Sequence, residues 1–240
     1  MTNKKKLTVI FIAVICFAII TAATVLLVSY LSEKKADDEL KRALKEYYDQ
    51  KLTLYKSENE LYEEFDVDVA FLGDSLTDGY DLGYYYPQYT VVNRGIGGDT
   101  SHGLEARLEV SLYDLCPKVA VILIGANNFD TMLDNYESIL LGIKDHLPKT
   151  KVVLCSLTAM GLGWKKNNRI AAYNNVTIKK LAAKHGFEFV DLYTPLFNVD
   201  TGEIFAEYTT DGGHLTDKGY RVLTDEITPY LEKLLDGWQK

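Results

Sequence analysis

The chain has 240 residues, of which 47% are hydrophobic, and its formal net charge is −8. This length allows one well-buried domain but not two large ones. Lys4, Lys5 and Lys6 are the only charged side chains before residue 32, so residues 32–240 carry a net charge of −11. Such an acidic surface argues against nucleic-acid binding, because a protein that holds phosphates needs a basic face.

The first apolar segment, Leu7–Leu31, contains no charged side chain. As a helix it would extend roughly 37 Å, which is enough to cross a membrane with some tilt. A cleaved signal peptide is the alternative, since Thr21 and Ala23 are small enough for a cleavage site, but the apolar run continues to Leu31. The lysines before the segment favour a cytoplasmic amino terminus. We therefore expect a single-pass protein at the cell membrane, with its folded domain extracellular.

The next segment is rich in Glu, Lys, Leu and Tyr, and residues 33–64 contain neither Gly nor Pro. This composition predicts a helical stalk, or a helix packed against the domain. Nothing in the segment indicates chemistry. The predicted organisation is a cytoplasmic tail at 1–6, a transmembrane anchor at 7–31, a helical stalk or linker at 32–65 and a folded domain at 66–240.

From residue 66 onward, short apolar runs alternate with amphipathic helical stretches, which is typical of a parallel sheet covered on both faces. Helical periodicity marks two stretches, one through Leu133 to Ile143 and one through Ile170 to Ala182 that ends at Gly186. A last helix is expected from Lys218 to about Asp236. The predicted strands are 67–72, 90–93, 119–124, 151–155 and 187–190.

Ligands bind outside the carboxyl ends of the strands in open α/β sheets, so the residues that follow each strand matter most. After the first strand, Gly73-Asp74-Ser75-Leu76 would place the Ser75 hydroxyl and N–H at the start of a helix, although a simple Asp or Ser cap explains the same pattern. Glycines within 94–100 follow the second strand and would let N–H groups approach a bound oxygen. Residues 125–128 follow the third strand and offer a side-chain amide. Ordinary turns explain both of these segments as well.

A fourth block, Asp211-Gly212-Gly213-His214, precedes the last helix. A carboxylate three residues before an imidazole can hold the nearer ring nitrogen and leave the other for Ser75. Taken singly, such a histidine is more often a surface or capping residue. The four blocks together, however, supply a nucleophile, an oriented base and oxyanion donors at one edge of the sheet.

These four blocks resemble the SGNH, or GDSL, hydrolase superfamily, from about residue 67 to residue 235. The resemblance implies a flavodoxin-like three-layer α/β/α sandwich with a five-stranded parallel sheet, preceded here by the transmembrane helix. It also implies a serine esterase that needs no metal and no organic cofactor. By this resemblance the catalytic triad is Ser75, Asp211 and His214, and the oxyanion hole is formed by Ser75, Gly98 and Asn127. The family's usual Val before the His is Gly213 in this chain.

The substrate is suggested by weaker signals. Residues 93–108 are similar to the second block of platelet-activating-factor acetylhydrolase subunits, and Asn128 matches their double asparagine, which favours short acyl groups. Residues 161–168 contain Trp164 among polar side chains and suit a polar substrate better than a lipid tail. We therefore expect short-chain, acetyl-like esters, with O-acyl glycans among the substrates, and Asp74, Asn128 and Trp164 as substrate contacts.

Several alternatives stay open on the same residues. Tyr84, Tyr85 and Tyr86 could join Trp164 in an aromatic platform for a sugar, but packing within loops also explains these side chains. An O-acyltransferase, a longer-chain lipase or a thioesterase would use the same triad. A metallophosphoesterase could use Asp74, Asp99, Asn127 and His214 as ligands, but such sites normally need more histidines. A non-catalytic binding module at the cell surface is the remaining alternative.

Overall fold

The structure, a computed structural model, describes residues 3–236 and 238, with side chains described at residue 11 and from residue 21 onward. It contains two compact units, Met1–Tyr47 and Tyr48–Lys240. Helix α1 (Asn3–Asn59) runs through the first unit into the second and includes most of the predicted stalk or linker, 32–65. Among the residues so described, no helix is long and apolar enough to span a membrane. Within the predicted anchor, 7–31, side chains are described only at residue 11 and from residue 21 onward, and the structure gives the anchor no support.

The second unit contains a five-stranded parallel sheet with the strand order β2-β1-β3-β4-β5. This order is that of a flavodoxin-like fold, in which the chain changes direction between β1 and β3 and ligands bind beside that point. The prediction of five parallel strands is confirmed. The strands are β1 (Val69–Gly73), β2 (Val91–Gly95), β3 (Val119–Leu123), β4 (Lys151–Cys155) and β5 (Glu188–Val190).

Helices connect these strands, and the predicted last helix corresponds to α7 (Asp217–Asp236). The other α-helices are α2 (Ser75–Asp78), α3 (Leu82–Tyr85), α4 (Ser101–Ala106), α5 (Tyr136–His146) and α6 (Asn168–His185). A π-helix, Glu109–Tyr113, and short 3-10 helices at Met132–Asp134, Leu162–Asn167, Thr194–Leu196 and Ala206–Tyr208 lie between them. A small antiparallel pair, β6 (Phe197–Asn198) and β7 (Glu203–Ile204), precedes α7.

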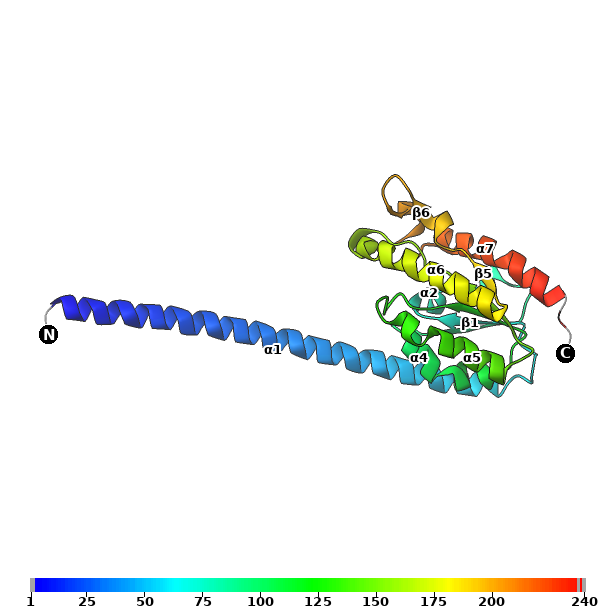
Figure 1. Ribbon diagram of the computed structural model, residues 1–240. Helices are drawn as coiled ribbons and strands as arrows, with labels where there is room; N and C mark the ends of the chain where they lie inside the picture. The colour runs from blue at the N-terminus through cyan, green and yellow to red at the C-terminus, as the bar shows by residue number, and fades with distance from the viewer. Residues whose placement is uncertain (1–2, 237, 239–240) are drawn as a thin grey trace. The chain divides into compact units, whose positions relative to one another are not determined.

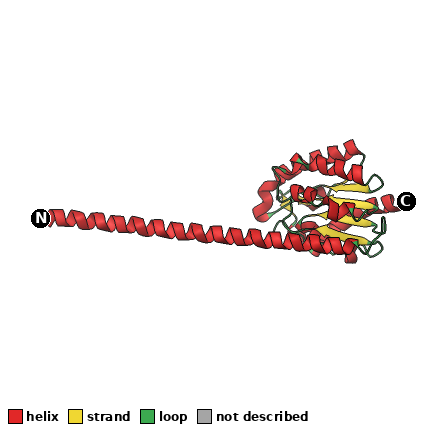
Figure 2. Cartoon of the chain, turned by 90° about the horizontal axis from the view of Figure 1, so that it is seen from below, coloured by secondary structure: helices red, strands yellow, loops and turns green. Residues whose placement is uncertain are grey.

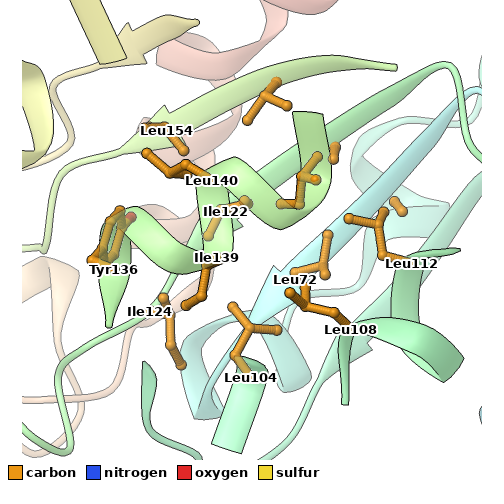
Figure 3. Packing of buried hydrophobic residues seen from close by; sticks show 14 of the residues in the cluster. Leu72, Leu104, Leu108, Leu112, Ile122, Ile124, Tyr136, Ile139, Leu140 and Leu154 are labelled. Atoms are coloured by element: carbon orange, nitrogen blue, oxygen red, sulfur yellow. The ribbon is translucent and has the colours of Figure 1, made fainter. Parts of the chain in front are cut away.

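The sheet lies between two layers of helices, with the strands enclosed by helices in Figures 1 and 2. Successive strand residues point to opposite faces, so each strand contributes to two cores. In β1, Ala70 and Leu72 pack with α4, α5 and α6, whereas Val69 and Phe71 pack with α7. Figure 3 shows the first core, where side chains of the strands and of α5 interdigitate. Both faces are therefore closed, and the carboxyl edge of the sheet is left as the place for a ligand.

Candidate active site

Ser75 lies where β1 ends and α2 begins, at the carboxyl edge of the sheet. Asp74 caps this helix, because its carboxylate accepts a hydrogen bond from the Leu76 N–H at 3.1 Å. The first N–H groups of a helix have no acceptor within the helix, so the N–H of Ser75 is placed to donate outward. The turn therefore presents both the hydroxyl and the N–H of one serine at the same edge.

His214 and Asp211 reach Ser75 from the loop that precedes α7. The Nε2 of His214 lies 3.1 Å from the Oγ of Ser75, and its Nδ1 lies 2.7 Å from Oδ2 of Asp211. The other carboxylate oxygen of Asp211 accepts the N–H groups of His214 at 2.7 Å and Gly213 at 2.9 Å. The structure thus joins the three residues in one chain of hydrogen bonds, the arrangement in which a carboxylate orients an imidazole beside a hydroxyl.

The hydrogen bonds to Asp211 also set its charge. The backbone and the ring of His214, followed by the N–H of Gly213, lower the pKa of Asp211 from 3.8 to about 2. Each bond favours the ionised carboxylate, because an ionised oxygen is the better acceptor. Asp211 is therefore negatively charged at any pH above about 4, and it holds the nearer nitrogen of the His214 ring as the donor.

Gly212 is required by the geometry of this loop. Its φ is +90°, and a Cβ at this position would lie 2.2 Å from the carbonyl oxygen of Gly161. The Gly161 N–H in turn donates to the Gly212 carbonyl at 2.8 Å. The loop that carries His214 is thus paired with the start of the segment 161–168.

Trp164, from that segment, fills the space beside Gly213. A Cβ at Gly213 would lie 3.3 Å from the indole Nε1, which is closer than most real Cβ contacts. The indole therefore occupies the space into which the family's usual valine would extend. The Trp164 ring thus packs against the loop directly before His214, where glycine has no side chain to fill the space.

Asn127 follows β3 and turns toward the second block. Its Nδ2 donates to the carbonyl oxygen of Asp99 at 2.8 Å, and Asp99 follows Gly98 in the chain. A side-chain amide has two hydrogens on this nitrogen, so the second remains for an oxygen in the site. Asn127 and Ser75 line the same pocket. The contact with Asp99 joins the loop of Gly98 to this pocket.

That pocket has a cavity volume of about 60 Å³, and Ser75 and His214 lie on its wall. Much of the remaining wall is apolar and comes from Leu76, Leu123, Leu157 and Met160. The last two follow β4, a position that the sequence reasoning did not single out. The rule that ligands bind at carboxyl ends of strands could have found them, since β4 ends at the same edge.

Asp74 is 1% exposed and directly precedes Ser75. Burial raises its pKa from 3.8 to about 6, although N–H groups of Leu76 and Ala126 partly oppose the shift. Its carboxylate is therefore committed to capping α2, and its predicted contact with substrate stays a prediction.

Asn128 connects two loops of the site. Its Oδ1 accepts the Ser101 N–H at 3.2 Å, and its Nδ2 donates to the Ser101 Oγ at 2.9 Å. Asn128 and Trp164 also line a wider groove of about 810 Å³, which shares Asn127 and Trp164 with the small pocket. The predicted substrate residues Asn128 and Trp164 thus lie at this groove, and whether they bind substrate stays a prediction.

The aromatic run before β2 has a different place. Tyr86 is fully buried, and its ring packs against Phe71 and Tyr80 in the core shared with α7. Tyr84 is exposed, but its hydroxyl accepts a hydrogen bond from Arg221 on α7 at 2.9 Å. Packing therefore explains these tyrosines, and Trp164 is the aromatic side chain of the suggested platform that lines the groove.

Arg107 is a buried residue that the sequence reasoning missed. Its Nε donates to Oδ2 of Asp99 at 2.7 Å, and its two other nitrogens donate to the carbonyls of Arg94 at 2.8 Å and Gly73 at 3.0 Å. It thereby connects the ends of β1 and β2 to the loop of Gly98. The available signal was an arginine between Leu104 and Leu108, which lie on one face of a predicted helix.

The sequence profile of the GDSL-like lipase/acylhydrolase family matches residues 71–222. The chain belongs to this family. The activity class is accordingly that of an esterase or acylhydrolase, and the enzyme is a hydrolase. Among the described residues, no group of three His, Cys, Asp or Glu side chains is placed to hold a metal ion.

Solved structures of similar proteins support the assignment to the GDSL-like family. A Streptococcus pneumoniae protein assigned as a platelet activating factor is 27% identical, has a TM-score of 0.74 and matches 82% of this chain and 98% of its own. A Bacteroides fragilis protein assigned as an acylhydrolase is 26% identical, with a TM-score of 0.69, over 75% of this chain and 95% of its own. An acetyl xylan esterase of Geobacillus stearothermophilus, 22% identical with a TM-score of 0.57 over 74% of this chain and 97% of its own, shares the fold. None of the curated proteins matches the chain.

Proposed function

We propose that this GDSL-like hydrolase is a serine esterase that cleaves short-chain carboxylic esters, with Ser75 as nucleophile and His214 and Asp211 completing the triad. The observation that carries the proposal is the chain of hydrogen bonds from Asp211 through His214 to Ser75, at the wall of a small apolar pocket. The family assignment independently makes the protein an acylhydrolase.

The reaction proceeds in two steps of acyl transfer. The Ser75 Oγ attacks the ester carbonyl while Nε2 of His214 takes the hydroxyl proton. The tetrahedral intermediate collapses, the alcohol leaves with that proton, and the acyl group stays on Ser75. Water, deprotonated by His214, then attacks the acyl-enzyme. The second tetrahedral intermediate expels the Ser75 Oγ, which takes the proton back from His214, and the acid is released. Donors at the N–H of Ser75, the N–H of Gly98 and the amide of Asn127 stabilise the negative oxygen, each by about 3 kcal/mol.

The acyl length follows from the size of the pocket. At roughly 10–15 Å³ for each water-sized group, a cavity of about 60 Å³ has room for about four to six such groups. An acetyl to butyryl chain fits against Leu76, Leu157 and Met160, whereas a decanoyl chain would extend into water. Each methylene that remains solvated forfeits about 0.8 kcal/mol of burial. We therefore propose a preference for short acyl groups.

The alcohol part of the ester is proposed to be a saccharide. The wider groove adjoins the pocket at Asn127 and Trp164, so a leaving group attached to the reacting carbonyl would extend into it. Its lining combines the half-exposed Trp164 ring with side chains of Thr131, Lys166 and Asn167. An aromatic face beside hydroxyl, amide and ammonium groups suits a sugar ring with many hydroxyls. The acetyl xylan esterase with the same fold acts on such an ester.

The location of the enzyme is also a proposal, and it rests on the sequence alone. The uncharged run 7–31 after three lysines supports a membrane anchor with the catalytic domain outside the cell. Protease treatment of intact cells should then remove the domain. Full protection of the domain would reverse the proposed orientation.

The function is tested with p-nitrophenyl esters of two to sixteen carbons, each below its micelle concentration. The full-length protein should cleave acetyl and butyryl esters with at least tenfold higher kcat/KM than decanoyl or longer esters, a difference of about 1.4 kcal/mol. Ser75→Ala should abolish hydrolysis and labelling by a fluorophosphonate probe, with Tm within a few degrees of the parent value. Retention of more than a few per cent of activity in this variant would refute the nucleophile assignment, and a maximum at eight carbons or beyond would refute the short-acyl preference.

A substitution of Trp164 in the groove tests the proposal that the alcohol part of the ester is a saccharide. Trp164→Phe should raise KM for an acetylated xylo-oligosaccharide more than for p-nitrophenyl acetate. Both acetyl groups can meet the indole in the small pocket, but only the saccharide extends along the groove that the indole also lines. Release of acetate from the two substrates is the measurement. Equal effects on the two substrates would contradict a sugar-binding groove, while leaving the roles of Ser75 and His214 untouched.

A further inference from the structure

The last turns of α1 present a polar face to the catalytic unit. Lys51, Tyr55, Glu58 and Asn59 are spaced so that they lie on one side of a helix, and they belong to the same compact unit as the sheet. Each contacts a segment close to the active site. This face is therefore more than a surface of a stalk, although the sequence had indicated no chemistry here.

The first contact of this face is with Arg94, whose side chain is completely buried near the end of β2. Its Nη1 lies 2.5 Å from Oε2 of Glu58, and its Nη2 donates to Oδ1 of Asn59 at 3.0 Å. The guanidinium also lies 4.6 Å from the centre of the Tyr55 ring. A buried cation needs such partners, so α1 supplies the charge that allows Arg94 to be buried.

The second contact is at Gly95, where β2 ends. The hydroxyl of Tyr55, itself 1% exposed, donates to the Gly95 carbonyl. The backbones are close here: a Cβ at Gly95 would lie 2.2 Å from the backbone nitrogen of Asp78, the last residue of α2. Tyr55 therefore holds the loop after β2 where this loop meets the helix that begins at Ser75.

The third contact is made by the carboxylate of Asp78, which links the end of α2 with the loop after β2. Oδ1 of Asp78 lies 2.8 Å from Nζ of Lys51, and its Oδ2 accepts the Gly97 N–H at 3.0 Å. The side chains of Lys51 and Asp78 are 18% and 16% exposed, so water screens their attraction only in part. Gly97 directly precedes Gly98. The ion pair thus orients a carboxylate that connects α2 with the loop of the expected oxyanion donor.

We propose that Lys51 is a positioning residue of the esterase: through Asp78 it holds the Gly97–Gly98 backbone at the distance from Ser75 that oxyanion stabilisation needs. This inference rests on the proposed function, because the donor role of Gly98 belongs to it. Tyr55 and Glu58 support the same loop through Gly95 and Arg94, the residues that precede it. Residues 48–59 are accordingly part of the catalytic unit, and a domain boundary at residue 66 would omit them.

The test compares Lys51→Met with Lys56→Met in the full-length protein. Both changes remove an ammonium group from the same helix, but Lys56 lies on its exposed side. With p-nitrophenyl acetate, Lys51→Met should lower kcat about tenfold and leave KM within twofold, because the donor acts in the transition state. Lys51→Arg should restore most of kcat, and Lys56→Met should behave like the parent protein.

A double-mutant cycle separates positioning from loss of stability. Asp78→Asn should lower kcat as Lys51→Met does, and the double variant should be no worse than the more impaired single variant, because both changes act on one connection. Additive losses, a wild-type kcat in Lys51→Met, or a loss of kcat matched by a fall in Tm would overturn the proposal. If the parent protein cleaves no ester, the proposed function itself fails. This result differs from those above, in which the parent protein is active.

Discussion

Burial of Asp74 beside Ser75 predicts that the chain is most stable, relative to an Asp74→Asn variant, at acid pH. The folded pKa is raised from 3.8 to about 6 by burial. A carboxyl with a raised pKa stabilises the fold fully below its unfolded pKa, and this contribution is lost as pH rises through the folded pKa. At neutral pH the cost of the buried charge is therefore about 3 kcal/mol, since each pKa unit corresponds to 1.36 kcal/mol.

Asn at position 74 is neutral at every pH and keeps one oxygen for the Leu76 N–H, so the cap is retained. It forfeits the second acceptor oxygen, and with it the hydrogen bond from the Ala126 N–H, at about 1 kcal/mol. The variant should therefore gain stability relative to the parent protein as pH rises. Between about pH 4.5 and pH 8 this relative gain in unfolding free energy should amount to roughly 2 kcal/mol.

Urea unfolding of the parent and the variant at the two pH values measures this difference. Asp81→Asn is the matched control, because Asp81 caps α3 in the same way but is exposed. The control should show no relative gain at the higher pH. If the difference in unfolding free energy between Asp74→Asn and the parent protein does not change with pH, the reasoning that burial raises the pKa of the Asp74 carboxyl is refuted.

Two further predictions concern the loop of His214. Asp211→Asn should lower kcat by about 10³–10⁴-fold with little change in KM, because the amide no longer favours the His214 tautomer whose Nε2 can accept the Ser75 proton. Steady-state kinetics at pH 8 measure this effect, and a loss below tenfold would contradict the role of Asp211. Gly212→Ala should lower both Tm and activity, since φ is +90° and the new Cβ would meet the Gly161 carbonyl; a variant with the Tm and kcat of the parent would show that this pairing is dispensable.

The sheet and the motifs were largely predictable from the sequence. Runs such as 119–124 and 151–155 are apolar because a parallel strand is buried on both faces, and this requirement is local to each run. The blocks around Ser75 and His214 follow from the rule that the carboxyl ends of parallel strands meet at one edge, which holds whatever the side chains are. A single sequence could therefore indicate which residues face the site.

Contacts between distant segments were decided by the tertiary structure alone. The spacing of Lys51, Tyr55 and Glu58 on α1 is equally typical of a solvated helix. Only their contacts with Arg94, Gly95 and Asp78 make this face part of the unit that contains the sheet. The size of the small pocket likewise depends on how side chains from α2, β3 and the loop after β4 close against one another. Close packing fixes the volume of such a pocket to within a few atoms. The side chains that line the pocket come from positions far apart in the chain, so periodicity within any one segment carries no information about the volume.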